Sequence, residues 1–391
     1  MRLQLSPELE AFREEMRTFF TTQVSQQIRD TVAARRDLSK EQYVEAMRTL
    51  NAAGLAVPHW PVEWGGRGWT PLQMHIWREE MQLAGVPEPL AFNASMIGPV
   101  IATFGSQELK ERFLPATANL DIWWCQGFSE PDAGSDLASL RTTAVRDGDD
   151  WVVNGQKTWT TLGQHADWIF CLVRTDPTAE KKQRGISLLV FPMDTPGVTL
   201  RPIQLIDGGH EVNEVFFEDV RVPAENLIGE ENRGWDYAKF LLGNERVGIA
   251  RIGYTKRLLA QAKEHAGEIT VAGRPLADDP RMAARIAELE NELVALELTA
   301  LRVVANSAGG RPHPASSVLK LRGSELQQAI TELVVDIAGP LSLSSFADGG
   351  SEVPDWARVA TPEYLNYRKV SIYGGSNEVQ RTIIAGTILG L

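Results

Sequence analysis

The chain has 391 residues, of which 43% are hydrophobic and 23% are charged, and its net charge at pH 7 is −12. This composition is typical of a globular protein that can bury a large core and divide into two or three domains. Lys and Arg form no cluster, so the sequence predicts no nucleic-acid face. No apolar run reaches about 18 residues and the start does not resemble a signal peptide, so we expect no membrane span.

The two cysteines and six histidines indicate neither a disulfide framework nor a metal site. Cys125 and Cys171 lie in segments typical of core strands, which predicts two buried thiols in a reducing, cytoplasmic location. The histidines have no metal-ligand spacing and no partner cysteines, so we expect no metal.

Residues 1–118 have a helical pattern. Ser6 precedes a proline and an acidic first turn, which is typical of a helix N-cap. Ser39 and Gln42 are spaced as a capping box, and Thr70 precedes a proline that begins another helix. The segment is therefore predicted to be a helical N-terminal domain.

Between residues 119 and 232 the pattern changes to that of β-strands. Asp147–Gly148 and Asn154–Gly155 separate runs rich in β-branched and aromatic residues, and such dipeptides predict hairpin turns. We expect an antiparallel β-barrel or sandwich domain of about seven strands. Its clearest later strands are expected at 168–173, 186–191 and 215–222.

From Gly234 onward the helical period returns, and the C-terminal domain, 233–391, is predicted to be an antiparallel four-helix bundle. The fold class is therefore α+β, with a helical domain, a β domain and a bundle in that order. The four long helices are expected near 235–265, 280–308, 313–341 and 361–388.

Four segments resemble motifs of the acyl-CoA dehydrogenase family, in order and at the family's spacing. The resemblance covers essentially the whole chain and implies FAD as cofactor, an acyl-CoA thioester as substrate and an electron-transfer flavoprotein as electron acceptor. No Gly-x-Gly-x-x-Gly follows a strand, which agrees with a flavin held outside a Rossmann unit. The four segments are Trp124–Asp136, Asn154–Thr161, Val215–Gly229 and Ile372–Arg381.

The resemblance assigns the flavin ring to the first two motifs. The ring needs hydrogen bonds to its pyrimidine edge and N5 and apolar packing on one face, which groups near Gln126, Phe128 and Ser129 would supply together with the second motif. Thr161 would hydrogen-bond N5, where the hydride arrives, and Trp159 would pack beside the ring. Taken alone, Trp159 would also suit the aromatic position of a core strand.

Three further residues are assigned by the same resemblance. Ser376 and Glu378 in the tail motif would bind the cofactor, and Ser135 could touch the thioester end of the pantetheine. Ser135 could equally be a serine that caps its turn.

The glutamate that commonly serves as catalytic base in the family's tail motif is replaced here by Gly374. The backbone N–H of Gly374 can still donate to the thioester oxygen. Some relatives, including isovaleryl- and long-chain-type enzymes, carry the base on the first bundle helix before an arginine, and Glu245 with Arg246 matches that place. Glu245 is thus the expected base and Arg246 orients the site or contacts CoA, although an exposed helix carboxylate is the alternative for Glu245.

A second departure concerns the segment whose arginine, in homotetrameric relatives, reaches a neighbour's FAD pyrophosphate. Ile269 stands at that arginine and Ala272 at the following phenylalanine, while Arg274 is only nearby. An apolar residue cannot neutralise a pyrophosphate. We therefore expect a heterotetramer with a related subunit, or a homotetramer or dimer if Arg274 substitutes.

Paired-subunit enzymes of this kind act on bulky thioesters such as those of steroid side chains or dicarboxylates, and a glycine at 374 leaves room for such a group. The expected pathway is fatty acid or steroid side-chain β-oxidation. Two alternatives remain open: a flavin-dependent oxidase or monooxygenase on the same fold, and a flavin-holding or structural subunit of a heteromer.

Overall fold

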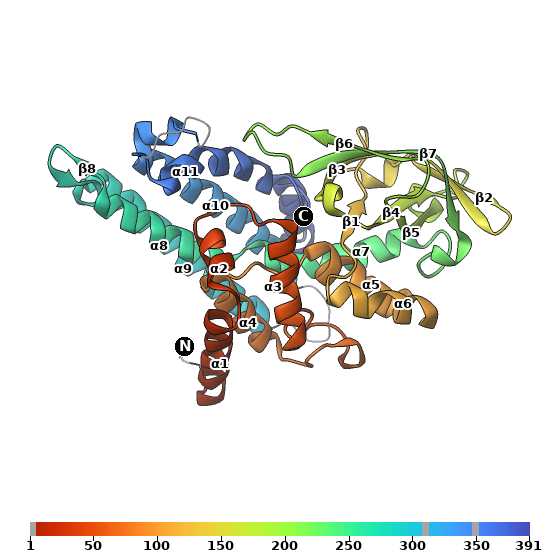
Figure 1. Ribbon diagram of the computed structural model, residues 1–391, viewed down its shortest axis with the longest axis horizontal. Coiled ribbons are helices and arrows are strands. Elements are labelled where there is room, and N and C mark those ends of the chain that lie inside the picture. The colour runs from red at the N-terminus through yellow and green to blue at the C-terminus, as the bar shows by residue number, and fades with distance from the viewer. Residues whose placement is uncertain (1–4, 307–312, 346–351) are drawn as a thin grey trace. The chain divides into compact units, whose positions relative to one another are not determined.

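The computed structural model describes residues 5–306, 313–345 and 352–391. The chain divides into two compact units that do not follow chain order (Figure 1). The first unit comprises the described residues of 1–49, 69–88 and 246–391, and the second comprises 50–68 and 89–245. The predicted three-domain boundaries at 118 and 232 stay a prediction.

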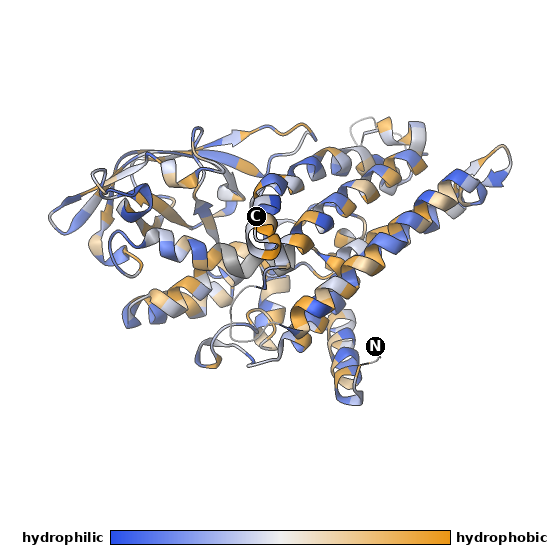
Figure 2. Ribbon diagram, turned by 180° about the vertical axis from the view of Figure 1, so that it is seen from behind, coloured by the Kyte–Doolittle hydropathy of each residue, from blue (hydrophilic) through white to orange (hydrophobic). Residues whose placement is uncertain are grey.

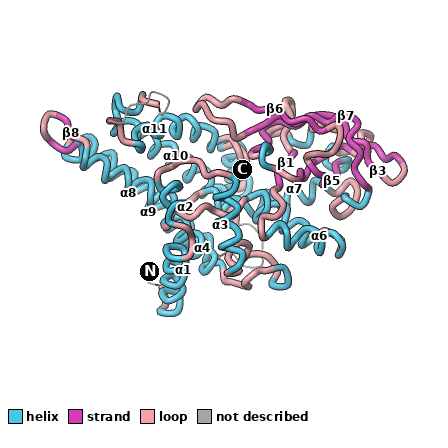
Figure 3. The backbone as a smooth tube through the Cα atoms, viewed as in Figure 1, coloured by secondary structure: helices cyan, strands magenta, loops and turns pink. Residues whose placement is uncertain are grey.

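The first unit is built from helices contributed by both ends of the chain (Figure 3). Helix α10 packs against α8, α9, α11 and α12, and hydrophobic and hydrophilic segments alternate along these helices (Figure 2). The helices are α1 (Pro7–Thr22), α2 (Gln26–Ala33), α3 (Lys40–Ala52), α4 (Pro71–Leu83), α8 (Ile252–Glu268), α9 (Pro280–Ala305), α10 (Ser316–Ala338), α11 (Asp355–Asn366) and α12 (Asn377–Ile384).

The predicted helix starts are confirmed where side-chain caps specify them. Ser6 Oγ accepts from the backbone N–H of Leu9 at the start of α1. Ser39 and Gln42 exchange both bonds of a capping box before α3, and Thr70 and Gln73 do so before α4. These contacts satisfy backbone donors that the first helical turn leaves unpaired.

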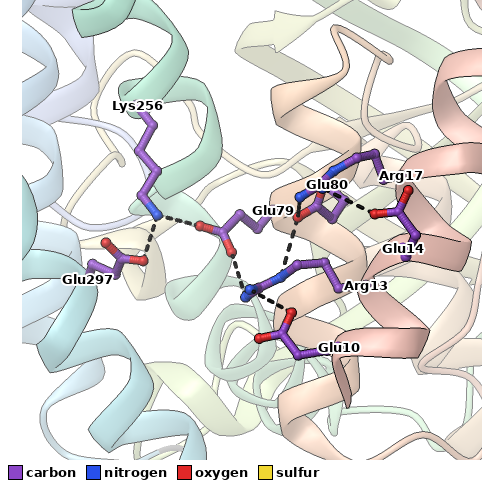
Figure 4. Close-up of polar contacts among 8 residues, drawn as sticks. All are labelled: Glu10, Arg13, Glu14, Arg17, Glu79, Glu80, Lys256 and Glu297. Carbon is purple, nitrogen blue, oxygen red and sulfur yellow. Dashed lines mark hydrogen bonds and ion pairs between the residues drawn. The ribbon is translucent and has the colours of Figure 1, made fainter. Parts of the chain in front are cut away.

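A cluster of charged side chains from α1, α4, α8 and α9, in which Glu79 and Glu80 are buried, holds this unit together (Figure 4). Glu79 of α4 lies between Lys256 of α8, at 2.6 Å, and Arg13 of α1, at 3.8 Å. Lys256 also bonds Glu297 of α9 at 2.5 Å. Although burial opposes its ionisation, the nearby Lys256 keeps the pKa of Glu79 below its usual value. The cluster thus ties segments that are more than 200 residues apart in the chain.

Two of the long helices predicted for the bundle are interrupted. The helix expected at 235–265 is α7 (Gly234–Ile249) followed by α8, because Arg251 adopts a left-handed conformation with φ of +43°. The helix expected at 361–388 is α11, a 3-10 turn at Tyr367–Ser371, a glycine turn, α12 and a π-helical turn at Ala385–Leu389. Arg251 is not a helix-breaking residue type, so the sequence pattern did not reveal the first break, whereas Gly374 and Gly375 lie at the second.

The second unit contains a seven-stranded sheet in the order β1-β4-β2-β3-β7-β6, with β5 paired to β4. The expected antiparallel sheet is mixed instead, because β1 pairs with β4 in parallel. Its core is formed by strand residues such as Val153, Ile169 and Phe191. The strands are β1 (Trp124–Gly127), β2 (Thr143–Asp147), β3 (Asp150–Thr161), β4 (Trp168–Arg174), β5 (Ile186–Pro192), β6 (Val198–Ile203) and β7 (Val212–Pro223).

Asp147–Gly148 forms the predicted hairpin between β2 and β3, but the hairpin predicted at Asn154–Gly155 is wrong. Strand β3 continues through these residues with a bulge opposite β7. The Asn154 side chain bonds both the backbone N–H and the carboxylate of Asp219 on β7. Gly155 has a φ of +140°, and a Cβ there would lie 2.7 Å from Thr142 Cα. The dipeptide therefore serves as a bulge rather than a turn.

Helical segments of the second unit are α5 (Gly98–Phe104), α6 (Gln107–Ala118) and a π-helical segment, Phe92–Ile97. Cys125 and Cys171 are buried free thiols, as expected. Within the described part of the chain, no helix combines the length and apolar character that crossing a membrane requires. The same residues contain no group of three or more His, Cys, Asp or Glu side chains placed to hold a metal ion.

Candidate active site

The second unit brings together the predicted flavin residues on β1, β3 and the turn after β1. Gln126 is half-buried on β1, and Phe128 is buried with its ring edge-on to Phe170 at 5.7 Å. The carbonyl of Ser129 accepts the backbone N–H of Thr158 at 2.9 Å. This bond places the turn after β1 directly beside the end of β3.

Trp159 is the most unusual side chain of this region. It is 58% exposed although it lies on a sheet strand, and its φ is +60°. A register shift between β3 and β7 at Lys157 and Thr160 accommodates this conformation. Left-handed backbone costs free energy in a bulky residue, and such strained positions are found more often at functional sites. This exposure shows that Trp159 is not a core aromatic, and its contact with a ligand stays a prediction.

The strand end also offers polar groups next to this indole. Thr160 is fully buried, whereas Thr161 is half-buried and its Oγ1 makes only a 3.5 Å contact with the carbonyl of Trp159. An exposed flat aromatic beside a weakly engaged hydroxyl suits a planar heteroaromatic ring with a hydrogen-bonding edge. The residues present thus fit a flavin.

A buried ion pair that the sequence analysis missed fixes this surface. Lys157 Nζ lies 2.7 Å from Glu130 Oε1 and 3.1 Å from the carbonyl of Phe128. Glu130 also accepts the backbone N–H groups of Arg141 and Thr142. Burial opposes ionisation of Glu130, but Lys157 keeps its pKa below the usual value. The sequence did contain one signal for this ion pair. Lys157 is a charged residue within a predicted strand, two residues before the expected ligand aromatic Trp159.

Ser135 is exposed on the turn Gly134–Asp136, and an added Cβ at Gly134 would meet no atom within 4 Å. The turn therefore has space on its outer side, although its own geometry assigns no ligand to Ser135.

The first unit carries the tail residues. Gly374 and Gly375 both have left-handed backbone, with φ of +64° and +83°, and Gln380 Nε2 donates to their two carbonyls at 3.3 and 3.2 Å. Ser376 is the N-cap of α12 and accepts from Val379 N. Glu378 is exposed, and its own backbone N–H with the Ser376 hydroxyl lowers its pKa. A carboxylate at this helix start is electrostatically favoured without any ligand.

Glu245 and Arg246 lie on α7, and the boundary between the two units falls between them. Their side chains are outside the described residues, so their catalytic roles stay predictions.

The segment in place of the family's pyrophosphate clamp forms a two-stranded hairpin, β8 (Thr270–Val271) and β9 (Arg274–Pro275), beyond the end of α8 (Figure 3). Ile269 is half-buried and packs on the helical core. Arg274 is exposed on β9. The apolar side chain at 269 thus has a packing role.

Family models match the chain in three consecutive stretches. They describe the acyl-CoA dehydrogenase N-terminal domain over residues 6–121, the middle domain over 125–220 and the C-terminal domain over 232–389. The chain belongs to the acyl-CoA dehydrogenase family. The predicted fold and the predicted enzyme class, an oxidoreductase acting on CH–CH bonds, are both confirmed.

Relatives from Mycobacterium tuberculosis are similar along most of the chain. The acyl-CoA dehydrogenase IpdE1 is 39% identical and covers 88% of this chain and 86% of its own. The acyl-CoA dehydrogenase FadE26 is 33% identical and covers 100% and 99%. In the solved ChsE4-ChsE5 complex from the same organism, the matching chain is 33% identical, with a TM-score of 0.86 and coverage of 100% and 99%. A structure named the Tcur3481-Tcur3483 steroid ACAD is 29% identical, with a TM-score of 0.87 and the same coverage.

Proposed function

We propose that the chain catalyses α,β-dehydrogenation of an acyl-CoA thioester, with Glu245 as the base that takes the α-proton. The observation that carries this proposal is the left-handed turn at Gly374, which presents a backbone N–H but no carboxylate. Helix α7 carries Glu245, and the sequence around this residue resembles that of relatives with a helix-borne base. Position 374 lacks a carboxylate, and in this proposal Glu245 supplies the base instead.

FAD is the cofactor that fits the residues present. Gln126, Phe128, Ser129, Trp159 and Thr161 would hold its ring, and Ser376 and Glu378 would bind its remaining parts. When bound, FAD supplies the hydride acceptor, N5 of the isoalloxazine. A related glutaryl-CoA dehydrogenase of the same fold has been solved with FADH2, which supports this choice.

The remaining chemistry belongs to the protein. The α-proton of a thioester is weakly acidic, so removing it requires a positioned base and a hydrogen bond to the carbonyl oxygen. Glu245 takes the proton, and the Gly374 N–H donates to the oxygen as negative charge builds there. Ser135 contacts the thioester end of the pantetheine, and Arg246 orients the site.

The test of this function is Glu245→Gln. The variant should retain FAD yet no longer lose its flavin absorbance when mixed with an acyl-CoA that bleaches the wild type. Glu264→Gln, at an exposed position on the next helix, is the matched control and should bleach normally. Normal bleaching of the Glu245→Gln variant would exclude Glu245 as the base.

The proposal also covers the partner subunit and the substrate. The apolar Ile269 at the clamp position and the likeness to chains named in the ChsE4-ChsE5 complex and the Tcur3481-Tcur3483 steroid ACAD support a heteromer with a related subunit. A bulky acyl group such as a steroid side chain is the proposed substrate, and an electron-transfer flavoprotein is the proposed acceptor. The buried free thiols support a cytoplasmic location.

The ratio of FAD to chain, measured across a size-exclusion peak of the protein expressed alone, tests the heteromer. A colourless, smaller species supports a flavin site completed by a partner. A stable tetramer with one FAD per chain would contradict it, and would mean that Arg274 or another group replaces the clamp.

A further inference from the structure

A lysine is buried at the start of the helix that follows the tail turn. Lys320 of α10 has no exposed surface, and its Nζ lies 3.0 Å from Oδ1 of Asn377, the first residue of α12. Ser324, one helical turn further along α10, has its Oγ 3.1 Å from the same oxygen. Two side chains of α10 therefore converge on one amide of α12.

The same face of α12 holds the glycine turn. Asn377 and Gln380 are three residues apart, so they lie on one side of the helix. Gln380 is also buried, and its Nε2 donates to the carbonyls of both Gly374 and Gly375. A shift of α12 relative to α10 would consequently move the Gly374 N–H.

The position is unfavourable for a cation. The N-terminal end of a helix carries partial positive charge, so the dipole of α12 opposes an ammonium there. Among the described residues, the Lys320 ammonium has one hydrogen-bond acceptor for its three donors. Burial lowers its pKa to about 8, with Glu378 opposing that shift. An apolar side chain of similar length would fill this space at lower cost in free energy, so packing alone does not account for the lysine.

We propose that Lys320 is a positioning residue for the reaction. Through Asn377 it fixes the start of α12, and with it the turn from which the Gly374 N–H meets the thioester oxygen. The inference rests on the proposed function of Gly374. In this proposal Lys320 contacts neither substrate nor cofactor, and it acts only through the backbone of the turn.

Lys320→Met tests the inference in the FAD-loaded protein, together with its partner subunit if FAD loading requires one. Amide hydrogen exchange in the segment 372–380 should rise several-fold, because the turn loses its tie to α10. Flavin bleaching by an acyl-CoA should slow by about 10- to 100-fold, since a misplaced donor stabilises the developing charge poorly. The bleaching rate is calculated per bound FAD, because the proposed cofactor residues Ser376 and Glu378 flank Asn377.

Ser317→Ala is the matched control. Ser317 lies one turn before Lys320 on the same helix, is equally buried, and its Oγ has no hydrogen-bond partner among the described residues. Removing the Ser317 hydroxyl should change neither the amide exchange of residues 372–380 nor the rate of flavin bleaching. If Lys320→Met does not fold, Asn377→Leu breaks the same contact from the other helix.

The double variant Lys320→Met/Asn377→Leu should be no slower than the slower single variant, because both act on one contact. Unchanged exchange in 372–380, an unchanged bleaching rate, or independent effects of the two changes would each overturn the inference. If the wild type bleaches with no acyl-CoA, the proposed function fails instead, and the exchange measurement still decides whether Lys320 holds the turn.

Discussion

Lys157 Nζ lies 2.7 Å from Glu130 Oε1, and this buried pair joins strand β3 to the turn after β1. The two segments carry Trp159 on one side and Phe128 and Ser129 on the other. A single ion pair thus fixes both segments of the proposed flavin surface. Neither of its members is itself expected to touch the ring.

Lys157→Met should therefore destabilise the protein and weaken FAD binding together. It leaves the Glu130 carboxylate buried with only backbone donors, and breaking a buried pair typically costs about 3 kcal/mol of the free energy of unfolding. Chemical denaturation with and without FAD measures both effects. Lys239→Met, at an exposed lysine paired with Asp236 at 3.0 Å, is the control and should cost less than about 1 kcal/mol.

Trp159→Gly should have opposite effects on stability and on binding. Glycine adopts a φ of +60° without strain and little burial is lost, so the FAD-free protein should gain up to about 1 kcal/mol in the free energy of unfolding. FAD affinity should fall because the flavin ring loses the indole that is proposed to pack beside it. Equal FAD affinity in variant and wild type would show that Trp159 does not contact the cofactor.

The turn at Gly374 and Gly375 predicts that glycine-to-alanine substitutions in the tail destabilise the protein at some positions and not at others. Gly375→Ala places a Cβ 2.6 Å from Gln380 Nε2 at a φ of +83°, so it should cost about 1–2 kcal/mol and loosen the turn. Gly386→Ala is the control, since a Cβ there meets no atom within 4 Å. Thermal unfolding and proteolysis of the C-terminal segment compare the two variants, and equal behaviour would contradict a constrained turn.

The sequence predicted the elements that local chemistry specifies. Helix starts at Ser6, Ser39 and Thr70 were found because their caps are sequence-local, and the β2–β3 hairpin because Asp147–Gly148 favours a tight turn. Asn154–Gly155 carries the same signal but is recruited by Asp219, 65 residues later, which no local pattern reveals.

Residues 80–102 also take their structure from contacts that no local pattern reveals. The segment contains a π-helical turn at Phe92–Ile97, whose period differs from that of an α-helix. It is held by distant contacts: the Trp60 indole donates to the carbonyl of Ala94, and Asn93 donates to the carbonyls of Thr117 and Ile122. In the candidate site, the family motifs predicted Trp159 and Gly374, whereas Lys157–Glu130 and Lys320–Asn377 are long-range pairs that only the fold brings together.

The charged cluster of the first unit predicts an acid-sensitive contribution to stability. The pKa of Glu79 is lowered in the folded protein, so its contribution is present above the ordinary value of 4.5 and is lost as the pH falls through the folded value. Glu79→Gln should cost about 2 kcal/mol at pH 7, and the difference from wild type should shrink below pH 4.5. Glu290→Gln, in an exposed pair with Lys263, should have little effect at either pH.

Lys320 also predicts a stability that rises with pH, but in the alkaline range and through the relief of a cost rather than the gain of a contact. Its pKa is about 8 in the folded protein against an ordinary value of 10.5, so the unfolded chain binds the proton more tightly. Below pH 8 the folded protein bears the whole cost of the buried charge, which is at most about 3 kcal/mol. This cost decreases as the pH rises towards 10.5, because the buried amine loses its proton first.

Lys320→Met should therefore be at least as stable as wild type at pH 7, and its advantage should narrow between pH 8 and 10. The free energy of unfolding of both proteins, measured across this range, gives the difference without interference from other titrating groups. A variant that is less stable at pH 7, with a difference that does not change with pH, would mean that the ammonium stabilises the fold. A variant that is more stable but slower would mean that the lysine is retained for the reaction, at the expense of stability.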